Sequence, residues 1–303
     1  MIQGGTGWIP DPRGRVDATS DSPHIRASLD LITGSLPDTV KLPDTVNLQA
    51  VFPPVFNQGS TNSCTANALA ALIDYFEMKA SGRFVAPSRM FIYKVTRNLL
   101  QTNSTDSGAY LRTALESVAM LGAAPESYWP FDPALLAAEP PAFVYGMARN
   151  FVPSTYYRYD PDGVEKTEVL KRIKTNLAIG IPAAFGFYLF ESIVSGHATG
   201  KIPFPGADEK GIGGHAVVAV GYDDAMEIEN GANKTIGALR IRNSWGPSWG
   251  DDGYGWLPYE YVLKSLAIDW WSLFKVEWFD MDQGIFQIPA AAAAPAPTPK
   301  KPK

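Results

Sequence analysis

The stretch QGSTNSCTANA, residues 58–68, forms a turn that leads directly into a helical pattern, and it decides the fold of this chain. Cys64 stands at the junction and is the only cysteine among 303 residues. A thiol at a helix N-terminus faces unpaired backbone N–H groups, and beside a cation its pKa can fall from about 8.5 toward 3.5–7.5. Most lone cysteines are small buried hydrophobes. The setting of Cys64 instead predicts a nucleophile that is ionised at neutral pH.

Three polar side chains elsewhere in the sequence could assist such a thiolate. His215 stands at the mouth of the apolar run 216–220, which predicts a buried strand that would fix the imidazole. Asn243 follows a short alternating strand and could hold the second ring nitrogen. Gln58 precedes the cysteine closely enough to point its amide N–H at a developing oxyanion.

Two other histidines compete with His215 for the role of base. His24 lies in the N-terminal part of the chain, and His197 lies in the polar stretch SGHATG at residues 195–200. Neither precedes a buried strand. His215 is therefore the preferred base, and loop or surface positions are expected for the other two.

The chain resembles a papain-like cysteine peptidase of the disulfide-poor kind found in bacteria and phages. The matching motifs are Gln58-Gly59-Ser60 with Ser63-Cys64, Gly214-His215-Ala216-Val217 with Val220-Gly221-Tyr222, and Asn243-Ser244-Trp245-Gly246 followed by Trp249-Gly250 and Gly253-Tyr254-Gly255. Together they cover about residues 50–288. The resemblance implies an α+β, papain-like two-lobe fold, in which a helical lobe is followed by a β-barrel-like lobe and the active site lies in the cleft between them.

The resemblance also implies a role for each catalytic residue. Cys64 would attack a peptide carbonyl and form a thioester, while its backbone N–H and the Gln58 side chain hold the oxyanion. His215 would move the protons, and Asn243 would orient His215. The expected partner is a peptide or protein substrate, and no cofactor is implied.

Four further residues are expected to contact substrate on the same grounds: Gly108, Ala109, Gly214 and Trp245. Trp245 would also shield the histidine and asparagine from water, the alternative being an ordinary core tryptophan. The sequence departs from the family at Thr65, where an aromatic residue is usual, and at Thr61, where a disulfide cysteine is usual. Many members also have a second glycine where Ala109 stands. These departures leave acyl transfer intact but put the family's substrate preferences in doubt.

Composition argues against several other classes of protein. A single cysteine cannot form an internal disulfide and no signal segment is visible, so a cytoplasmic location is expected. No apolar run is long enough to cross a membrane, and a net charge of −5 offers no footprint for nucleic acid. One cysteine and three scattered histidines show no metal-ligand spacing, and the pairs Asp223-Asp224 and Asp251-Asp252 are interpreted as solvated turns. The oligomeric state stays open.

Four segments are expected along the chain. Residues 1–48 are rich in Pro, Gly, Asp and Thr and predict an extended arm, residues 49–145 the helical lobe, residues 146–288 the β-rich lobe, and residues 289–303 a disordered Ala/Pro/Lys tail. Helices are expected at 64–81, 88–100, 110–122 and 164–179, and strands at 181–187, 217–220 and 238–242 with a turn over 227–233.

Two alternatives to hydrolysis remain open. An acyl transferase of the transglutaminase or transpeptidase type would use the same thioester, although such enzymes more often pair histidine with aspartate than with an asparagine such as Asn243. A non-catalytic peptide-binding homologue would keep the fold, although the intact Cys, His, Asn and Gln set argues against it. The arm could restrain activity, or it could strap the lobes together through Trp8 and Pro10. Endopeptidase and exopeptidase action are both compatible with these residues.

Overall fold

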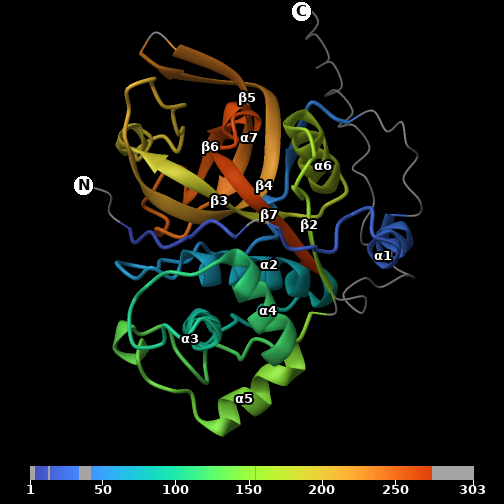
Figure 1. Ribbon diagram of the computed structural model, residues 1–303, viewed down its shortest axis with the longest axis vertical. Coiled ribbons are helices and arrows are strands. Elements are labelled where there is room, and N and C mark those ends of the chain that lie inside the picture. The colour runs from blue at the N-terminus through green and yellow to red at the C-terminus, as the bar shows by residue number, and fades with distance from the viewer. Residues whose placement is uncertain (1–3, 13, 34–41, 154, 232, 275–303) are drawn as a thin grey trace, which may run out of the picture.

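Helices and sheet occupy separate halves of the molecule. The computed structural model describes residues 4–12, 14–33, 42–153, 155–231 and 233–274. Helices α2 to α5 gather on one side and the strands on the other, with α6 and α7 beside the strands (Figure 1). This arrangement confirms the α+β, two-lobe architecture expected from the sequence.

The α-helices are α1 Pro23–Thr33, α2 Cys64–Ser81, α3 Arg89–Leu99, α4 Leu111–Leu121, α5 Ala142–Ala148, α6 Lys166–Ala178 and α7 Tyr259–Leu263. The strands are β1 Thr45–Asn47, β2 Thr155–Arg158, β3 Ala183–Phe190, β4 Gly211–Asn230, β5 Asn233–Arg242, β6 Tyr254–Pro258 and β7 Ala267–Phe274. Short 3-10 turns are η1 Gln49–Val51, η2 Pro133–Leu135, η3 Arg149–Phe151 and η4 Glu191–Val194. Among the described helices, none combines the length and the apolar character needed to cross a membrane.

One antiparallel sheet forms the second half of the molecule. Its strand order is β2-β7-β3-β4-β5-β6, and β1 pairs with β4 off this path. Phe187 of β3 lies opposite His215 of β4, and Val218 of β4 lies opposite Arg242 of β5. Because Asn243 directly follows β5, this register delivers it beside the strand that carries His215.

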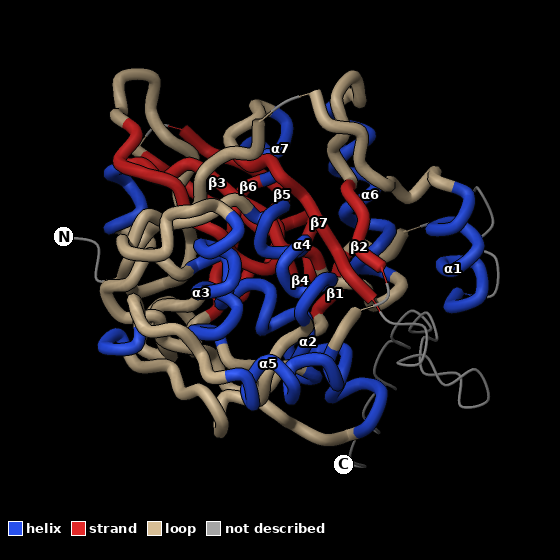
Figure 2. The backbone as a smooth tube through the Cα atoms, turned by 60° about the horizontal axis from the view of Figure 1, so that its bottom comes forward, coloured by secondary structure: helices blue, strands red, loops and turns tan. Residues whose placement is uncertain are grey.

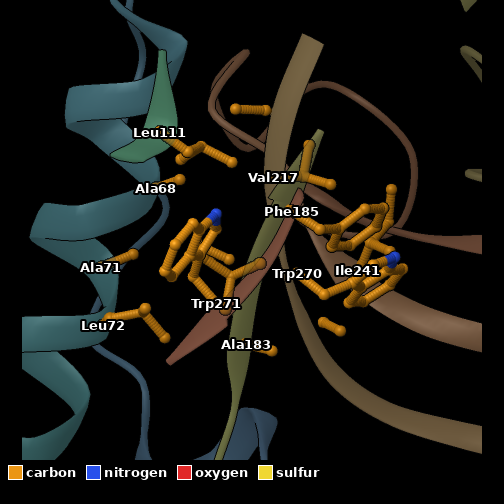
Figure 3. Close-up of a cluster of buried hydrophobic side chains, with 14 of the residues drawn as sticks. Ala68, Ala71, Leu72, Leu111, Ala183, Phe185, Val217, Ile241, Trp270 and Trp271 are labelled. Carbon is orange, nitrogen blue, oxygen red and sulfur yellow. The ribbon is translucent and has the colours of Figure 1, made fainter. Parts of the chain in front are cut away.

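Helix α2 packs on the sheet through small side chains. Ala68, Ala71 and Leu72 face Trp271 and its neighbours on the sheet (Figure 3), and all four are buried. Alanine at such a contact lets the helix axis approach the strands closely. The approach sets the N-terminal residue of α2, Cys64, against the sheet.

The predicted helices and strands are confirmed, with small changes at their ends. The Ser88 hydroxyl accepts the backbone N–H of Phe91 and so fixes the start of α3 at the expected place. Helix α2 stops at Gly82, whose φ of 65° is the left-handed conformation that glycine adopts most easily. The other matches are α4 for 110–122, α6 for 164–179, and β3, β4 and β5 for the three expected strands.

The turn expected over residues 227–233 is wrong, because most of that segment is strand. Strand β4 continues to Asn230, which lies opposite Asn233 of β5. The ammonium of Lys234 lies 2.7 Å from the carboxylate of Glu227 across this hairpin. A run of charged residues in an exposed hairpin has the composition of a loop. Opposite charges that pair across the two strands nevertheless stabilise the hairpin.

The expectation that residues 1–48 form an extended arm is also wrong in part. Ser22 and Pro23 give a helix start, which the Pro-rich composition concealed, and the resulting helix α1 buries Ile25. Strand β1, which also lies within residues 1–48, pairs with β4 of the sheet. Figure 2 shows α1 and β1 apart from each other. The expected lobe boundary at residue 146 falls inside α5, and the expected tail, 289–303, lies outside the described residues.

Leu72→Ala should lower the free energy of unfolding by about 2–5 kcal/mol, because it removes a fully buried side chain from the contact between α2 and the sheet. Urea unfolding followed by tryptophan fluorescence measures the change. Leu99→Ala is the matched control, since Leu99 ends α3 and is 41% exposed, and its effect should stay within about 0.5 kcal/mol. Equal losses in the two variants would contradict the role assigned to this contact.

Candidate active site

Cys64 is the first residue of α2, and the loop before it is tied to the sheet side of the molecule. The backbone N–H of Gln58 donates to the carbonyl oxygen of Ser244 over 2.8 Å. Within the loop, the Thr61 hydroxyl donates to the carbonyl oxygen of Gln58, also over 2.8 Å. Cys64 is fully buried. The loop therefore places the helix start, with its unpaired N–H groups, around a thiol that solvent does not reach.

His215 and Asn243 form the hydrogen-bonded pair that the sequence predicts. Nε2 of His215 lies 2.8 Å from Oδ1 of Asn243, and this oxygen also accepts the Ser244 N–H over 2.7 Å. An amide oxygen only accepts hydrogen bonds, so in the neutral ring Nε2 carries the proton and Nδ1 keeps a lone pair. Nδ1 is buried and has no hydrogen-bond partner among the described residues. The ring is thus prepared to take a proton from a thiol.

The electrostatics of the site favour neutral groups. Burial raises the pKa of the Cys64 thiol to about 12, although nearby backbone N–H groups, led by that of Ala216, lower it. Burial also lowers the pKa of His215 to about 4, although the hydrogen bond to Asn243 raises it. The thiolate expected at neutral pH is therefore wrong for this closed state, because exclusion of water disfavours both charges. Ala216 directly follows His215, so the sulfur lies beside the strand that carries the base.

Trp245 covers the imidazole of His215. The two rings stack with their centroids 4.5 Å apart and an interplanar angle of 23°. Trp249 meets Trp245 edge-on, with 5.8 Å between the ring centroids. Trp245 is 7% exposed, so the stack keeps water from one face of the imidazole, as its expected shielding role requires.

The amide of Gln58 is oriented by a residue that the sequence analysis missed. The Ser244 hydroxyl donates to Oε1 of Gln58 over 2.6 Å, which directs Nε2 the other way. Nε2 donates to the carbonyl oxygens of Thr61, over 2.7 Å, and of Gly5, over 3.1 Å. Ser244 lies between Asn243 and Trp245 in one motif, and this position could have indicated a role for its hydroxyl in the site.

The N-terminal arm runs between the sheet and the helices (Figure 1, dark blue), where substrate binding is expected. The Gly7 N–H donates to the carbonyl oxygen of Gly214 over 3.1 Å, and the Gly7 carbonyl oxygen accepts the Ala109 N–H over 2.8 Å. A Cβ on Gly108 would overlap the backbone of Gly7. Three of the four residues expected to contact substrate, Gly108, Ala109 and Gly214, therefore contact the arm.

The fourth expected contact, Trp245, also engages the arm. Its indole N–H donates to the Gly5 carbonyl oxygen over 3.1 Å. The same carbonyl oxygen accepts Nε2 of Gln58, the donor expected to hold an oxyanion. The backbone N–H of Gly5 donates to the carbonyl oxygen of Gly59 over 2.8 Å. Gly5 thus brings a carbonyl group to the oxyanion donor.

Trp8 fills a pocket next to these contacts, a role that the sequence analysis did not predict. The indole lies on Gly186 and Gly214, where a Cβ would overlap it. It meets Tyr188 edge-on, with 5.4 Å between the centroids, and its Nε1 donates to Oδ2 of Asp269 over 3.2 Å. Trp8 is 3% exposed. A tryptophan within a Gly- and Pro-rich segment was the signal that this part of the arm is anchored.

The remaining sequence candidates lie outside this constellation. His24 is exposed on α1, and His197 lies in the turn after η4, where its N–H donates to the carbonyl oxygen of Val194 over 3.3 Å. In the described part of the chain, no group of three or more His, Cys, Asp or Glu side chains is placed to hold a metal ion.

Comparison with known proteins identifies the family. Residues 42–262 match the family described as papain family cysteine protease. The chain belongs to this family. It is 37% identical over 225 residues to an uncharacterized peptidase C1-like protein of Acanthamoeba polyphaga mimivirus, an alignment that covers 73% of this chain and 69% of the viral protein. It is 26% identical over 223 residues to cathepsin K of Mus musculus, covering 72% of this chain and 60% of cathepsin K.

Solved structures agree with this assignment. Xylellain, a cysteine protease from Xylella fastidiosa, matches with a TM-score of 0.72 and 33% identity, covering 90% of this chain and 97% of xylellain. Bromelain from Ananas comosus, solved with the E64 inhibitor, shares the fold with a TM-score of 0.54 and 17% identity over 77% of this chain and 100% of bromelain. The protein is a papain-like, cysteine-type peptidase that acts on peptide or protein substrates.

Iodoacetamide should fail to label Cys64 in the intact native peptidase at pH 6, because the thiol is buried and its pKa is raised to about 12. At pH 6 a thiol with such a pKa is protonated, and only a pH close to that value would ionise it in the closed state. Mass spectrometry after a fixed exposure measures the labelled fraction, with the urea-unfolded chain at pH 8 as the labelled control. Rapid native labelling at pH 6 would mean that the arm does not cover the site in solution.

Proposed function

We propose that this peptidase is latent: it hydrolyses peptide bonds through a thioester on Cys64, and its arm holds the cleft closed until the arm is displaced. The observation that carries the proposal is that every residue expected to contact substrate contacts the arm instead. Gly5 in particular presents its carbonyl oxygen to the side chain of Gln58. The arm therefore makes the main-chain interactions that a substrate needs.

Acylation would begin with a proton transfer inside the site. In the neutral pair, the thiol proton of Cys64 passes to the bare Nδ1 of His215 as the sulfur attacks the substrate carbonyl. The oxyanion that forms takes the place of the Gly5 carbonyl oxygen and accepts Nε2 of Gln58. Asn243 keeps Nε2 of the imidazolium occupied, which aims Nδ1 at the sulfur.

Collapse of this intermediate would release the first product. The C–N bond breaks, and His215 gives its proton to the leaving amine, leaving the acyl group on Cys64 as a thioester. Water then attacks the thioester carbonyl while His215 takes one of its protons. Breakage of the C–S bond releases the acid, and the proton returns to the sulfur.

The arm resists this chemistry because it runs in the direction opposite to a substrate. Since His215 protonates the leaving amine, the later residues of a substrate lie on the side of His215 and Trp245. The arm places its earlier residue, Gly5, on that side, and its later residue, Ile9, donates to the Ala109 carbonyl oxygen over 3.1 Å. A reversed peptide fills the groove without aligning its C–N bond for cleavage.

Buried ion pairs fasten the arm beyond the cleft. Asp17 pairs with Arg112, and Arg158 lies 3.7 Å from both Asp11 and Asp17. The side chains in these pairs are at most 10% exposed. Removing one partner of a buried pair leaves an uncompensated charge and typically costs about 3–5 kcal/mol. This part of the arm is integral to the fold, so single substitutions test latency better than deletion of residues 1–48.

Trp8→Ala should raise the rate of casein hydrolysis by the intact chain about 100-fold or more. The indole is buried only while the arm lies in the cleft, so its loss destabilises the closed state relative to the open state and raises the open fraction. Initial rates of peptide release measure the effect, and Cys64 should become labelled by iodoacetamide at pH 6 in the same variant. Val16→Ala is the matched control, since Val16 lies in the same arm and is fully exposed. Its rate should equal that of the unmodified chain. No gain in Trp8→Ala with native circular dichroism would refute latency.

In the Trp8→Ala background, Gln58→Ala should lower kcat about 100- to 1000-fold with little change in KM, because the lost donor acts mainly on the oxyanion. Ser244→Ala should lower kcat less, since the amide of Gln58 remains but loses the partner that orients it. Cys64→Ala should abolish hydrolysis while the native circular dichroism is kept. A rise in KM at constant kcat for Gln58→Ala would make Gln58 a substrate-binding residue only.

A further inference from the structure

The pocket that Trp8 fills has a charged residue at its base. Asp269 interrupts the apolar strand β7, AIDWWSLF at residues 267–274, and is 1% exposed. Its φ of 57° is left-handed, a conformation that aspartate and asparagine tolerate better than most residues. A buried carboxylate in such a strand needs partners, and the partners of Asp269 divide between the arm and the body of the peptidase.

The two oxygens of Asp269 have different kinds of partner. Oδ1 accepts Nη2 of Arg158 over 2.7 Å, a contact within the body. Oδ2 accepts Nε1 of Trp8 over 3.2 Å and the backbone N–H of Asp11 over 2.9 Å, and both donors belong to the arm. When the part of the arm around Trp8 leaves the cleft and the ion-paired part around Asp11 stays, Oδ1 keeps Arg158, and Oδ2 keeps the N–H of Asp11 but loses the indole donor.

The positive charge around Asp269 does not match the negative charge, because Arg112 and Arg158 are shared among Asp11, Asp17, Asp160 and Asp269. Arg158 is shared with a second buried acid, Asp160, whose Oδ1 lies 2.9 Å from Nε of Arg158. Burial raises the pKa of Asp269, while the N–H of Asp11 and the charge of Arg158 lower it. Departure of Trp8 removes a hydrogen-bond donor from Oδ2 and leaves this excess of negative charge unchanged. A side chain that brings a new donor or a positive charge to Oδ2 is therefore favoured over one that brings neither.

The shape of the pocket narrows the choice of side chain. Gly186 and Gly214 leave room for a flat group over the sheet, and the ring of Tyr188 forms a wall. The donor that Oδ2 loses, the Trp8 indole N–H, belongs to a flat side chain, and a guanidinium is also flat and carries several N–H donors and a positive charge. A lysine ammonium supplies donors and charge without the flat shape. Leucine or valine would fill the apolar part but would not replace the donor that Oδ2 has lost.

We infer that Asp269 makes the opened peptidase select substrates that carry arginine, and secondarily lysine, at the position that replaces Trp8. The inference rests on the proposed function, because it requires that the arm leave the cleft. It assigns Asp269 two alternating partners: the arm in the closed state and a basic side chain in the open state.

Binding tests this selection without any need for catalysis. In the intact chain carrying Trp8→Ala and Cys64→Ala, calorimetry compares benzamidine with benzamide, its neutral analogue of the same shape. Benzamidine should bind about tenfold tighter or better, as expected of a charge-assisted hydrogen bond. Asp269→Asn, which keeps the shape and tolerates the backbone, should erase the difference. Glu116→Gln, a carboxylate outside the pocket, should preserve it. Equal binding of the two compounds, or discrimination that survives Asp269→Asn, overturns the inference.

Hydrolysis of a fluorogenic tetrapeptide library by the Trp8→Ala chain provides the second measurement. At one position arginine should exceed leucine in kcat/KM by about tenfold or more, and Asp269→Asn should bring that ratio to about one. A preference for leucine at every position overturns the substrate assignment. If no peptide is cleaved but benzamidine still binds better than benzamide, the pocket stands and the proposed function fails. If Trp8→Ala loses its native circular dichroism, Trp8→Val replaces it in both measurements.

Discussion

Close contact between α2 and the sheet is the constraint on which the chemistry depends, because the nucleophile lies on the helix and the base on a strand. Alanines at the contact permit the approach, and two hydrogen bonds between Gln58 and Ser244 then fix the loop before Cys64 against the end of β5. A slip of one residue between β4 and β5 would turn His215 to the other face of the sheet and separate it from Asn243. Helix packing and strand register therefore act together on one small site.

In the proposed latent state, burial would keep an intact set of catalytic residues idle. The thiol and the imidazole both prefer their neutral forms in the closed cleft, and the main cause is exclusion of water rather than any displaced side chain. The histidine already has its asparagine partner, its tryptophan cover and a bare nitrogen. Opening of the cleft would mainly change the dielectric surroundings of these groups. Activation then needs no rearrangement of the catalytic residues themselves.

The sequence was most informative where a local pattern has one structural solution. Glycine stops, helical stripes and the motifs around Cys64, His215 and Asn243 located the main helices, the central strands and the residues that meet in the cleft. Sequence reasoning failed where the outcome depends on distant partners. The position of Trp8 follows from glycines and an aspartate far along the chain, and the raised pKa of Cys64 follows from burial among segments far apart in the sequence, with Trp8 and Ala216 among its neighbours. Local composition contains neither contact.

The covalent link between the arm and its own cleft has a consequence for how the proposed inhibition would depend on concentration. A segment tethered to its own cleft faces it at an effective concentration of roughly millimolar, whatever the dilution of the protein. An untethered peptide of the same sequence at micromolar levels would be about a thousandfold less effective, although it could form the same contacts. Latency would therefore be independent of how much protein a cell makes. A single break in the chain between the arm and the helical lobe would weaken it without altering any contact in the cleft.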